Sequence, residues 1–293
     1  MTPIHRIPAL AGVLATLLTA ALVLASCGPR EEGGGQRQAG GQAIARVPAA
    51  EGKEITIGSK NFTEQYILGE IYAQALEAAG FKVKKQLDLG SEQIAFKALK
   101  GGQIDAYPEY TGTSLTSFFD VKTERVPKDP HHAYQDTKAA YAREDITALP
   151  PTKFENTYRL GGLRETLDRL RVRTTSDLGP KSKDLTVTAY PECAQRDDCL
   201  LGVNRTYGTR FKDVVKSESP YEVLDAKEAD IGFLFTTDAQ LTLPKYGILE
   251  DDRKFFPPYN VSLGIRNDAL RKIGPEGQRV LEQVQGPLTV EVM

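Results

Sequence analysis

The sequence contains no tryptophan and only three histidines, which limits the chemistry that it can support. With so few imidazoles, His-based catalysis is disfavoured and a metal site built from several dispersed histidines is excluded. The formal charge of −2, from 37 basic and 39 acidic residues, gives no electrostatic reason to expect a nucleic-acid partner. Because tryptophan is missing, the 12 tyrosines and 11 phenylalanines are the aromatic surface available for binding.

The sequence also lacks the motifs of common α/β enzymes: it has no G-x-S-x-G elbow, no G-x-x-x-x-G-K-S/T loop and no G-x-G-x-x-G after a strand. His131 and His132 follow Asp-Pro and are expected to be solvated, with a metal pair as the alternative. Asp105 and Glu109 are expected to be structural, because nothing nearby in the sequence would raise the pKa of either carboxyl. We therefore expect no enzyme activity, no catalytic residues, no metal and no cofactor.

The N-terminus reads as a targeting segment. Residues 7–26 form a nearly unbroken apolar run after a short basic start, as in a secretory signal peptide. The run ends in Leu-Ala-Ser-Cys27, which resembles a bacterial lipobox, so residues 1–27 are expected to be a lipoprotein signal with Cys27 lipidated. The alternatives are a plain signal or an uncleaved membrane helix, because the run is long enough to span a bilayer. All these readings place the remaining chain outside the cytoplasm.

Residues 28–53 are rich in glycine and polar side chains and show no hydrophobic period. This composition predicts a flexible tether that reaches about 25–30 Å.

The cysteine count agrees with an extracytoplasmic location. If Cys27 carries lipid, an even pair remains, Cys193 and Cys199. In an oxidising compartment such a pair predicts one disulfide that closes a short loop, with two free thiols as the alternative.

From Glu54 onward, short β-rich runs alternate with amphipathic helical stretches. Residues 54–58 predict a strand, and apolar residues at helical spacing predict a helix over 63–79 that Gly80 ends. Further strands are predicted at 81–89, 104–107, 185–190, 210–216, 230–236 and 261–265, and further helices at 91–101, 268–273 and 275–285. A recurring β-α-β order predicts two α/β lobes with parallel strands and a hinged cleft. The lobes are expected at 54–155 plus 260–293 and at 156–259.

Polar and aromatic residues gather just after the predicted strands. The stretch 59–65 follows the first predicted strand and begins a helix, and it includes Lys60. The free backbone N–H groups at a helix start, together with a lysine, form a candidate binding site for an anion. Residues 107–113, 156–158, 235–238 and 256–259 place aromatic side chains at other junctions. Taken alone, such aromatics are more simply explained by packing than by a shared ligand cage.

These stretches resemble a known family, the extracytoplasmic substrate-binding proteins of ABC transporters for quaternary ammonium compounds such as glycine betaine, carnitine and choline. The resemblance is carried by IGSKNFTEQYILGEI (57–71), ALKGGQIDAYPEYTGT (98–113), ENTY (155–158), FTTDAQ (235–240) and LEDDRKFFPPY (249–259). It covers nearly all of 54–293 and implies a two-lobed, periplasmic-binding-protein-like (type II) fold that closes on its ligand.

The resemblance further implies a cage of aromatic rings around a trimethylammonium head, with polar groups at a carboxylate tail. The cage positions fall on Tyr110, Tyr158, Phe235 and Tyr259, and the carboxylate contacts on Lys60, Thr113 and Arg196. Phe235 stands where many family members have tyrosine, so the ring face is kept and a hydroxyl is lost. Since a quaternary ammonium has no N–H to donate, ring faces must recognise it. Two cations at the tail predict that betaines bind roughly tenfold or more tightly than choline.

The expected protein is thus a monomeric binding lipoprotein of an ABC importer, anchored outside the cytoplasm, with a permease and an ATPase as partners. Another solute, such as choline, ergothioneine, an amino-acid betaine or a polyamine, remains an alternative. A sensor built on the same fold is a second alternative.

Overall fold

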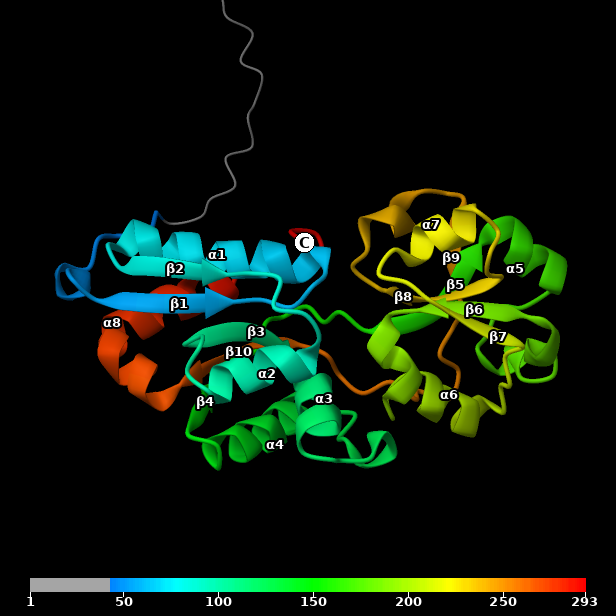
Figure 1. Ribbon diagram of the computed structural model, residues 1–293, viewed down its shortest axis with the longest axis horizontal. Coiled ribbons are helices and arrows are strands. Elements are labelled where there is room, and N and C mark those ends of the chain that lie inside the picture. The colour runs from blue at the N-terminus through cyan, green and yellow to red at the C-terminus, as the bar shows by residue number, and fades with distance from the viewer. Residues whose placement is uncertain (1–42) are drawn as a thin grey trace, which may run out of the picture. The chain divides into compact units, whose positions relative to one another are not determined.

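The computed structural model describes residues 43–293, so the predicted signal peptide, Cys27 and the start of the tether lie outside the described residues. Residues 43–293 form two mixed sheets of five strands, each with helices packed against it (Figure 1). The predicted α/β fold class is therefore confirmed.

The first sheet has the strand order β2-β1-β3-β10-β4. Its strands are β1 (Glu54–Gly58), β2 (Lys82–Gln86), β3 (Ala106–Tyr110), β4 (Ile146–Ala148) and β10 (Val261–Arg266). Strand β1 pairs in parallel with β2 and β3, whereas β10 lies antiparallel between β3 and β4. The predicted parallel arrangement of β1, β2 and β3 is confirmed, whereas β10 is antiparallel because it arrives from the other sheet rather than through a helical crossover.

The second sheet repeats this plan with the order β7-β6-β8-β5-β9. Its strands are β5 (Tyr158–Leu163), β6 (Thr186–Ala189), β7 (Asp213–Lys216), β8 (Ile231–Phe235) and β9 (Tyr246–Ile248). Strand β6 is parallel to β7 and β8, and β5 is antiparallel to β8 and β9. As in the first sheet, the antiparallel fourth strand of the order follows directly from a segment that joins the two sheets.

The helices cover both sheets (Figure 1). They are α1 (Thr63–Ala79), α2 (Glu92–Lys100), α3 (Thr111–Thr113), α4 (Pro130–Ala142), α5 (Arg164–Leu170), α6 (Leu200–Tyr207), α7 (Pro220–Asp225) and α8 (Asn267–Gln285). A π turn spans Ser114–Phe118, and 3-10 turns span Pro48–Ala50, Thr123–Arg125, Ser176–Leu178, Ser182–Asp184, Pro191–Gln195 and Ala239–Thr242. No helix within 43–293 combines the length and apolarity that crossing a membrane requires.

Two glycines with positive φ angles end or interrupt helices of the first lobe. Gly80 takes a left-handed conformation, φ 101°, and its N–H bonds to the last carbonyls of α1, which ends the helix where the sequence predicts. Gly274, at φ 72°, kinks α8 immediately before Pro275 and separates the two helices that the sequence predicts there.

The end of the predicted tether is packed against the body of the protein. The N–H of Val47 donates to the carbonyl of Ala79 at 2.8 Å, and Ala50 is completely buried. Ile44 packs against the same core. The prediction of a flexible tether is therefore wrong for residues 43–53, because apolar residues spaced by three anchor this stretch to the core.

Two segments, 149–157 and 249–260, run between the sheets, and we call them the first and second crossing (Figure 1). They lie side by side, because Glu155 and Asn260 form a β-bridge and the N–H of Asn156 donates to the carbonyl of Tyr259 at 3.2 Å. We call residues 43–148 with 261–293 the first lobe and residues 158–248 the second. The lobes touch where Phe62, after β1, stacks on Phe235, at the end of β8, with ring centroids 5.1 Å apart.

Candidate functional site

Every residue predicted for the ligand cage and the carboxylate tail lines one cavity at the junction of the lobes and crossings. These residues are Lys60, Tyr110, Thr113, Tyr158, Arg196, Phe235 and Tyr259. The cavity measures about 20 Å³, which holds about one water molecule. The structure thus unites residues from β3, β5, β8, the second crossing and a loop of the second lobe.

Five of the twelve residues that line the cavity are aromatic, and the places of Tyr110, Tyr158 and Phe235 follow from strand ends. Tyr158 begins β5 and is the direct register partner of Phe235, which ends β8. Their rings stack with centroids 4.7 Å apart, and Tyr259 stands edge-on to Tyr158 at 6.3 Å. Tyr110, at the end of β3, is stacked on Phe62 at 6.2 Å.

The rings must separate before a solute larger than a water molecule can lie between them. Phe62 and Tyr110 belong to the first lobe, whereas Tyr158 and Phe235 belong to the second. Separation of these two sets therefore corresponds to movement of the lobes about the crossings, the hinge motion that such folds use.

Lys60 forms an ion pair with a carboxylate of the first lobe. Its Nζ forms a buried ion pair with Oε1 of Glu109, and Glu109 also accepts from the hydroxyl of Tyr107 at 3.0 Å and the N–H of Tyr110 at 2.8 Å. Burial raises the pKa of Glu109, and the charge of Lys60 opposes this rise. The expectation of no pKa shift at Glu109 is therefore wrong, because the shift comes from burial in the fold. Lys60 Nζ also lies 4.6 Å from the ring centroid of Tyr110.

The predicted carboxylate contact Arg196 lies in a loop that the Cys193–Cys199 disulfide closes. Its Nε and Nη2 donate to both oxygens of Asp198 at 2.8 and 2.7 Å, and Nη2 also donates to Thr113 Oγ1 at 3.3 Å. Burial opposes ionisation of Asp198, but the Arg196 guanidinium prevails and lowers the pKa of that carboxyl. The Arg196 guanidinium also lies 5.6 Å from the ring centroid of Tyr158.

Sequence reasoning missed several residues of the cavity wall. Phe62 and Asn156 lie inside the motifs that carry the resemblance, and Asn61 is next to Lys60, so their positions were visible in the sequence. Glu92, in the first turn of α2, and Glu192, in the turn Pro191–Gln195, also line the cavity. No signal in the sequence joins these two glutamates, because they meet only through the contact between lobes.

The cavity wall therefore does not carry a positive charge. Lys60 is paired with Glu109, and Arg196 is paired with Asp198 and, at 3.8 Å, with Glu92, so the carboxylates at the wall outnumber its two cations. Burial raises the pKa of Glu192, and the neighbouring charge of Glu92 raises it further. This charge balance removes the premise of two free cations on which the predicted preference for betaines depends.

A buried carboxylate beside the cavity ties both lobes together. Glu64, in the first turn of α1, accepts hydrogen bonds from the hydroxyls of Tyr110 and Thr237 and from Asn156 Nδ2, the last at 3.0 Å. Burial raises the pKa of Glu64, and these hydrogen bonds act against the rise. The network joins the first lobe, the first crossing and the second lobe.

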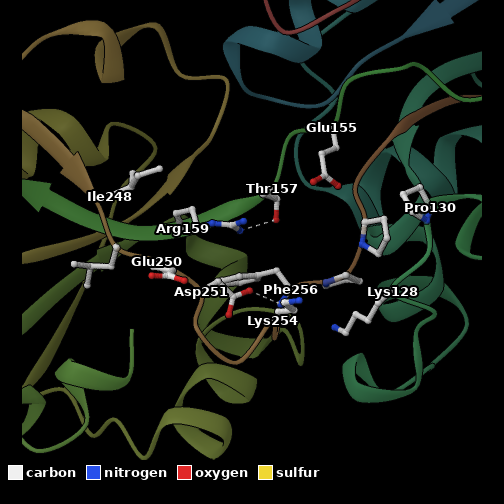
Figure 2. A pocket seen from close by; sticks show the side chains of 13 residues that line it. Lys128, Pro130, Glu155, Thr157, Arg159, Ile248, Glu250, Asp251, Lys254 and Phe256 are labelled. Atoms are coloured by element: carbon white, nitrogen blue, oxygen red, sulfur yellow. Dashed lines mark hydrogen bonds between the residues drawn. The ribbon is translucent and has the colours of Figure 1, made fainter. Parts of the chain in front are cut away.

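A larger cavity, of about 600 Å³, is lined by both crossings and the start of α4 (Figure 2). Charged residues of both signs line it, and in Figure 2 the Arg159 side chain reaches toward Thr157. Phe256 is the one aromatic ring among its lining residues, and the Arg159 guanidinium lies 5.9 Å from the centroid of that ring. We therefore place the candidate site in the ring-lined cavity.

The remaining candidates of the sequence lie away from the cavity. His131 and His132 are exposed in the first turn of α4, where the N–H of His132 donates to Asp129. Asp105 accepts from the N–H of Thr56 at 2.9 Å and so joins β1 to the start of β3. Residues 43–293 contain no cluster of three or more side chains suited to hold a metal ion.

Two α/β lobes, two crossings and a ring-lined cavity between them define a hinged solute-binding protein. Residues 53–293 match the family described as the substrate binding domain of the ABC-type glycine betaine transport system. The chain belongs to this family, and the predicted resemblance is confirmed.

Individual relatives agree with this assignment. The chain is 32% identical over 237 residues to a glycine-betaine-binding protein of Pseudomonas aeruginosa, covering 76% of this chain and 75% of that protein. It is 29% identical over 249 residues to the ergothioneine transport permease/ergothioneine binding protein EgtU of Helicobacter pylori, covering 84% of this chain but only 44% of that relative. A crystal structure of a glycine betaine/carnitine/choline ABC transporter matches with a TM-score of 0.63 and 27% identity over 80% of this chain and 88% of that one. The periplasmic-binding-protein-like fold is thus confirmed.

Proposed function

We propose that this protein binds a quaternary ammonium solute of the glycine betaine class in the ring-lined cavity and delivers it to an ABC permease. The observation that carries the proposal is the convergence of Tyr110, Tyr158, Phe235 and Tyr259, from separate segments, on one cavity. A trimethylammonium head spreads its charge over methyl groups, so it gains both from burial and from the negative faces of these rings.

The expected energies suffice for useful affinity. Each ring contributes about 0.5–2 kcal/mol of cation–π attraction, so four rings contribute several kcal/mol. A hydrogen bond between the tail of the solute and a charged residue of the wall contributes about 1.5–3 kcal/mol. Micromolar binding requires about 8 kcal/mol, and the surplus offsets the ordering of the ligand and closure of the lobes.

Closure follows from the position of the rings. A head group held by Tyr110 of the first lobe and by Tyr158 and Phe235 of the second contacts both lobes only when they are closed. The solute therefore stabilises the closed form, because the open form offers only part of the contacts. The permease, with its ATPase, then recognises the closed form.

The proposal includes a location outside the cytoplasm and attachment of a monomer to the membrane through lipidated Cys27. The N-terminal sequence pattern supports it, and so does the disulfide between Cys193 and Cys199, since disulfides persist in oxidising compartments. The relatives are solute-binding proteins of transporters, and we propose that this chain likewise has no enzyme activity.

Calorimetric titration with glycine betaine, carnitine, choline and ergothioneine tests the proposal. The decisive comparison pairs glycine betaine with 3,3-dimethylbutanoate, which replaces the ammonium nitrogen with carbon and keeps the shape. We expect the charged compound to bind at least tenfold more tightly, because only it gains cation–π attraction. Equal affinity of the two, or binding of none of the quaternary ammonium compounds, would contradict the proposed function.

A further inference from the structure

Glu92 is a buried carboxylate without a hydrogen-bond donor among residues 43–293. It lines the ring-lined cavity, and only 4% of its surface is exposed. Its one charged partner is Arg196, whose Nη1 lies 3.8 Å from Oε2, beyond hydrogen-bond distance. Within 43–293 its oxygens keep acceptor capacity toward the cavity, because the guanidinium of Arg196 stays at ion-pair distance.

Glu192 faces the same cavity from the second lobe and is close enough to Glu92 for their charges to interact. No side chain within 43–293 donates a hydrogen bond to its carboxylate, and burial raises its pKa. The two glutamates thus bring acceptor oxygens to one wall of the cavity from opposite lobes.

The basic groups of the cavity do not satisfy these oxygens. Lys60 is paired with Glu109, and Arg196 directs Nε and Nη2 toward Asp198. The wall therefore offers acceptors and negative charge to whatever occupies the cavity. A carboxylate tail would be repelled by these glutamates, whereas a hydroxyl or N–H group would supply the missing donor.

The two glutamates and Arg196 also mark the boundary of the cavity. All three line a second, adjoining space of about 920 Å³ that extends along α2 and the turn Pro191–Gln195. Because these three residues line both spaces, a solute whose head lies among the rings would direct its tail toward this boundary.

We infer that Glu92 and Glu192 determine solute specificity by accepting a hydrogen bond from a donor on the tail of the ligand. The inference rests on the proposed function and narrows it: the preferred solute is a quaternary ammonium compound with a hydroxyl or N–H group beyond its head. Choline has such a group, whereas glycine betaine has only acceptors in its tail. The expected order of affinities is thus the reverse of the order predicted from the sequence.

Choline and its methyl ether form a matched pair for the test. Both carry the trimethylammonium head and the same charge, and only choline has an O–H group that can donate a hydrogen bond. Calorimetry on the wild type is expected to show choline binding about tenfold or more tightly than the ether. In Glu92→Gln and Glu192→Gln, choline should lose most of this advantage over the ether. Thermal unfolding shows that each variant is folded. The control is Glu165→Gln, an exposed residue of α5 paired with Lys227, and it should retain the wild-type ratio.

Two results would overturn the inference and leave the proposed function intact. They are equal wild-type affinities for choline and the ether, and a preference for choline that survives both substitutions. Tighter binding of glycine betaine than of choline would also overturn it. If tetramethylammonium, choline and the ether all fail to bind the wild type, the proposed function fails together with the inference. If tetramethylammonium binds but choline and the ether bind equally tightly, the proposed function stands and only the inference fails.

Discussion

The carboxylate of Glu64 in the first lobe accepts a hydrogen bond from the hydroxyl of Thr237 in the second. Because this bond exists only when the lobes are closed, it stabilises the closed form without touching the ring-lined cavity. Ligand affinity includes the free energy of closure, so a weaker closed form binds more weakly.

Thr237→Val tests this link between closure and affinity. The substitution keeps the shape of the side chain and removes the donor, which leaves one oxygen of Glu64 unpaired and is expected to weaken solute binding about three- to tenfold. Calorimetry measures the affinity, and small-angle scattering measures the fraction of open molecules. The control, Thr242→Val, removes a hydroxyl that bonds only to the carbonyl of Ala239 and should leave affinity unchanged. Equal effects of both substitutions would contradict the role of Glu64 in closure.

Tyr158 tests the contribution of a ring face. Its hydroxyl has no hydrogen-bond partner within 43–293, so Tyr158→Phe should bind within about twofold of the wild type. Tyr158→Leu keeps an apolar side chain but removes the π face, and it is expected to lose about tenfold in affinity. Thermal unfolding checks that both variants are folded. A larger loss in the phenylalanine variant than in the leucine variant would show that the hydroxyl matters and the ring face does not.

The buried pair of Lys60 and Glu109 is expected to show strong coupling in stability. Lys60→Met or Glu109→Gln alone should destabilise the protein by about 3–5 kcal/mol, because each leaves a buried charge or donor without its partner. The double variant should be more stable than the sum of the single effects predicts. Urea unfolding of the four proteins measures the coupling. Additive effects would mean that the two groups act independently.

The disulfide between Cys193 and Cys199 is expected to support both stability and binding, because its loop carries Arg196. For so short a loop, the loss of the crosslink corresponds to about 2 kcal/mol. A reducing agent should therefore lower the melting temperature and weaken solute binding. The double variant Cys193→Ser/Cys199→Ser should show the same deficits and no response to the reductant. Unchanged binding after reduction would show that the loop keeps its conformation without the crosslink.

Asp238 makes stability depend on pH. Burial raises the pKa of this carboxyl from 3.8 to about 6, although the N–H of Phe235 and the hydroxyl of Tyr221 donate to it. Between these pH values the folded protein binds more protons than the unfolded chain, so the contribution of Asp238 to stability falls as pH rises and is constant above about pH 6. The pKa difference corresponds to about 3 kcal/mol.

Asp238→Asn removes this titration and retains an oxygen that accepts both hydrogen bonds. Relative to the wild type, the variant should gain stability as pH rises from 4 to 7, by up to about 3 kcal/mol in urea unfolding. A stability difference that does not change with pH would exclude Asp238 as the titrating group.

The elements most accurately predicted from the sequence are those with local signals. The spacing of apolar residues and the position of Gly80 predicted the bounds of α1 correctly. The two helices predicted at 268–273 and 275–285 correspond to the two parts of α8 on either side of Gly274. Strand β5 was missed, because its Gly-Gly pair lowers its strand propensity and its pairing with β8 is not local. The extended conformation of β5 therefore depends on its packing against the neighbouring strands β8 and β9.

The same distinction applies to the candidate site. The resemblance pointed to four of the five rings and to both basic residues, and the structure places all of these in one cavity. The partners of the basic residues were not predictable, since Glu109 and Asp198 become partners only through side-chain directions in the folded chain. Glu92 and Glu192 come from opposite lobes, and nothing in their local sequence indicates that they meet.

The most direct test of the central claim is a crystal structure of this protein with a bound trimethylammonium solute. Our account predicts that the quaternary nitrogen lies within about 6 Å of the ring centroids of Tyr110, Tyr158, Phe235 and Tyr259, with the lobes closed around it. A head group bound elsewhere, for instance in the larger cavity between the crossings, would contradict it.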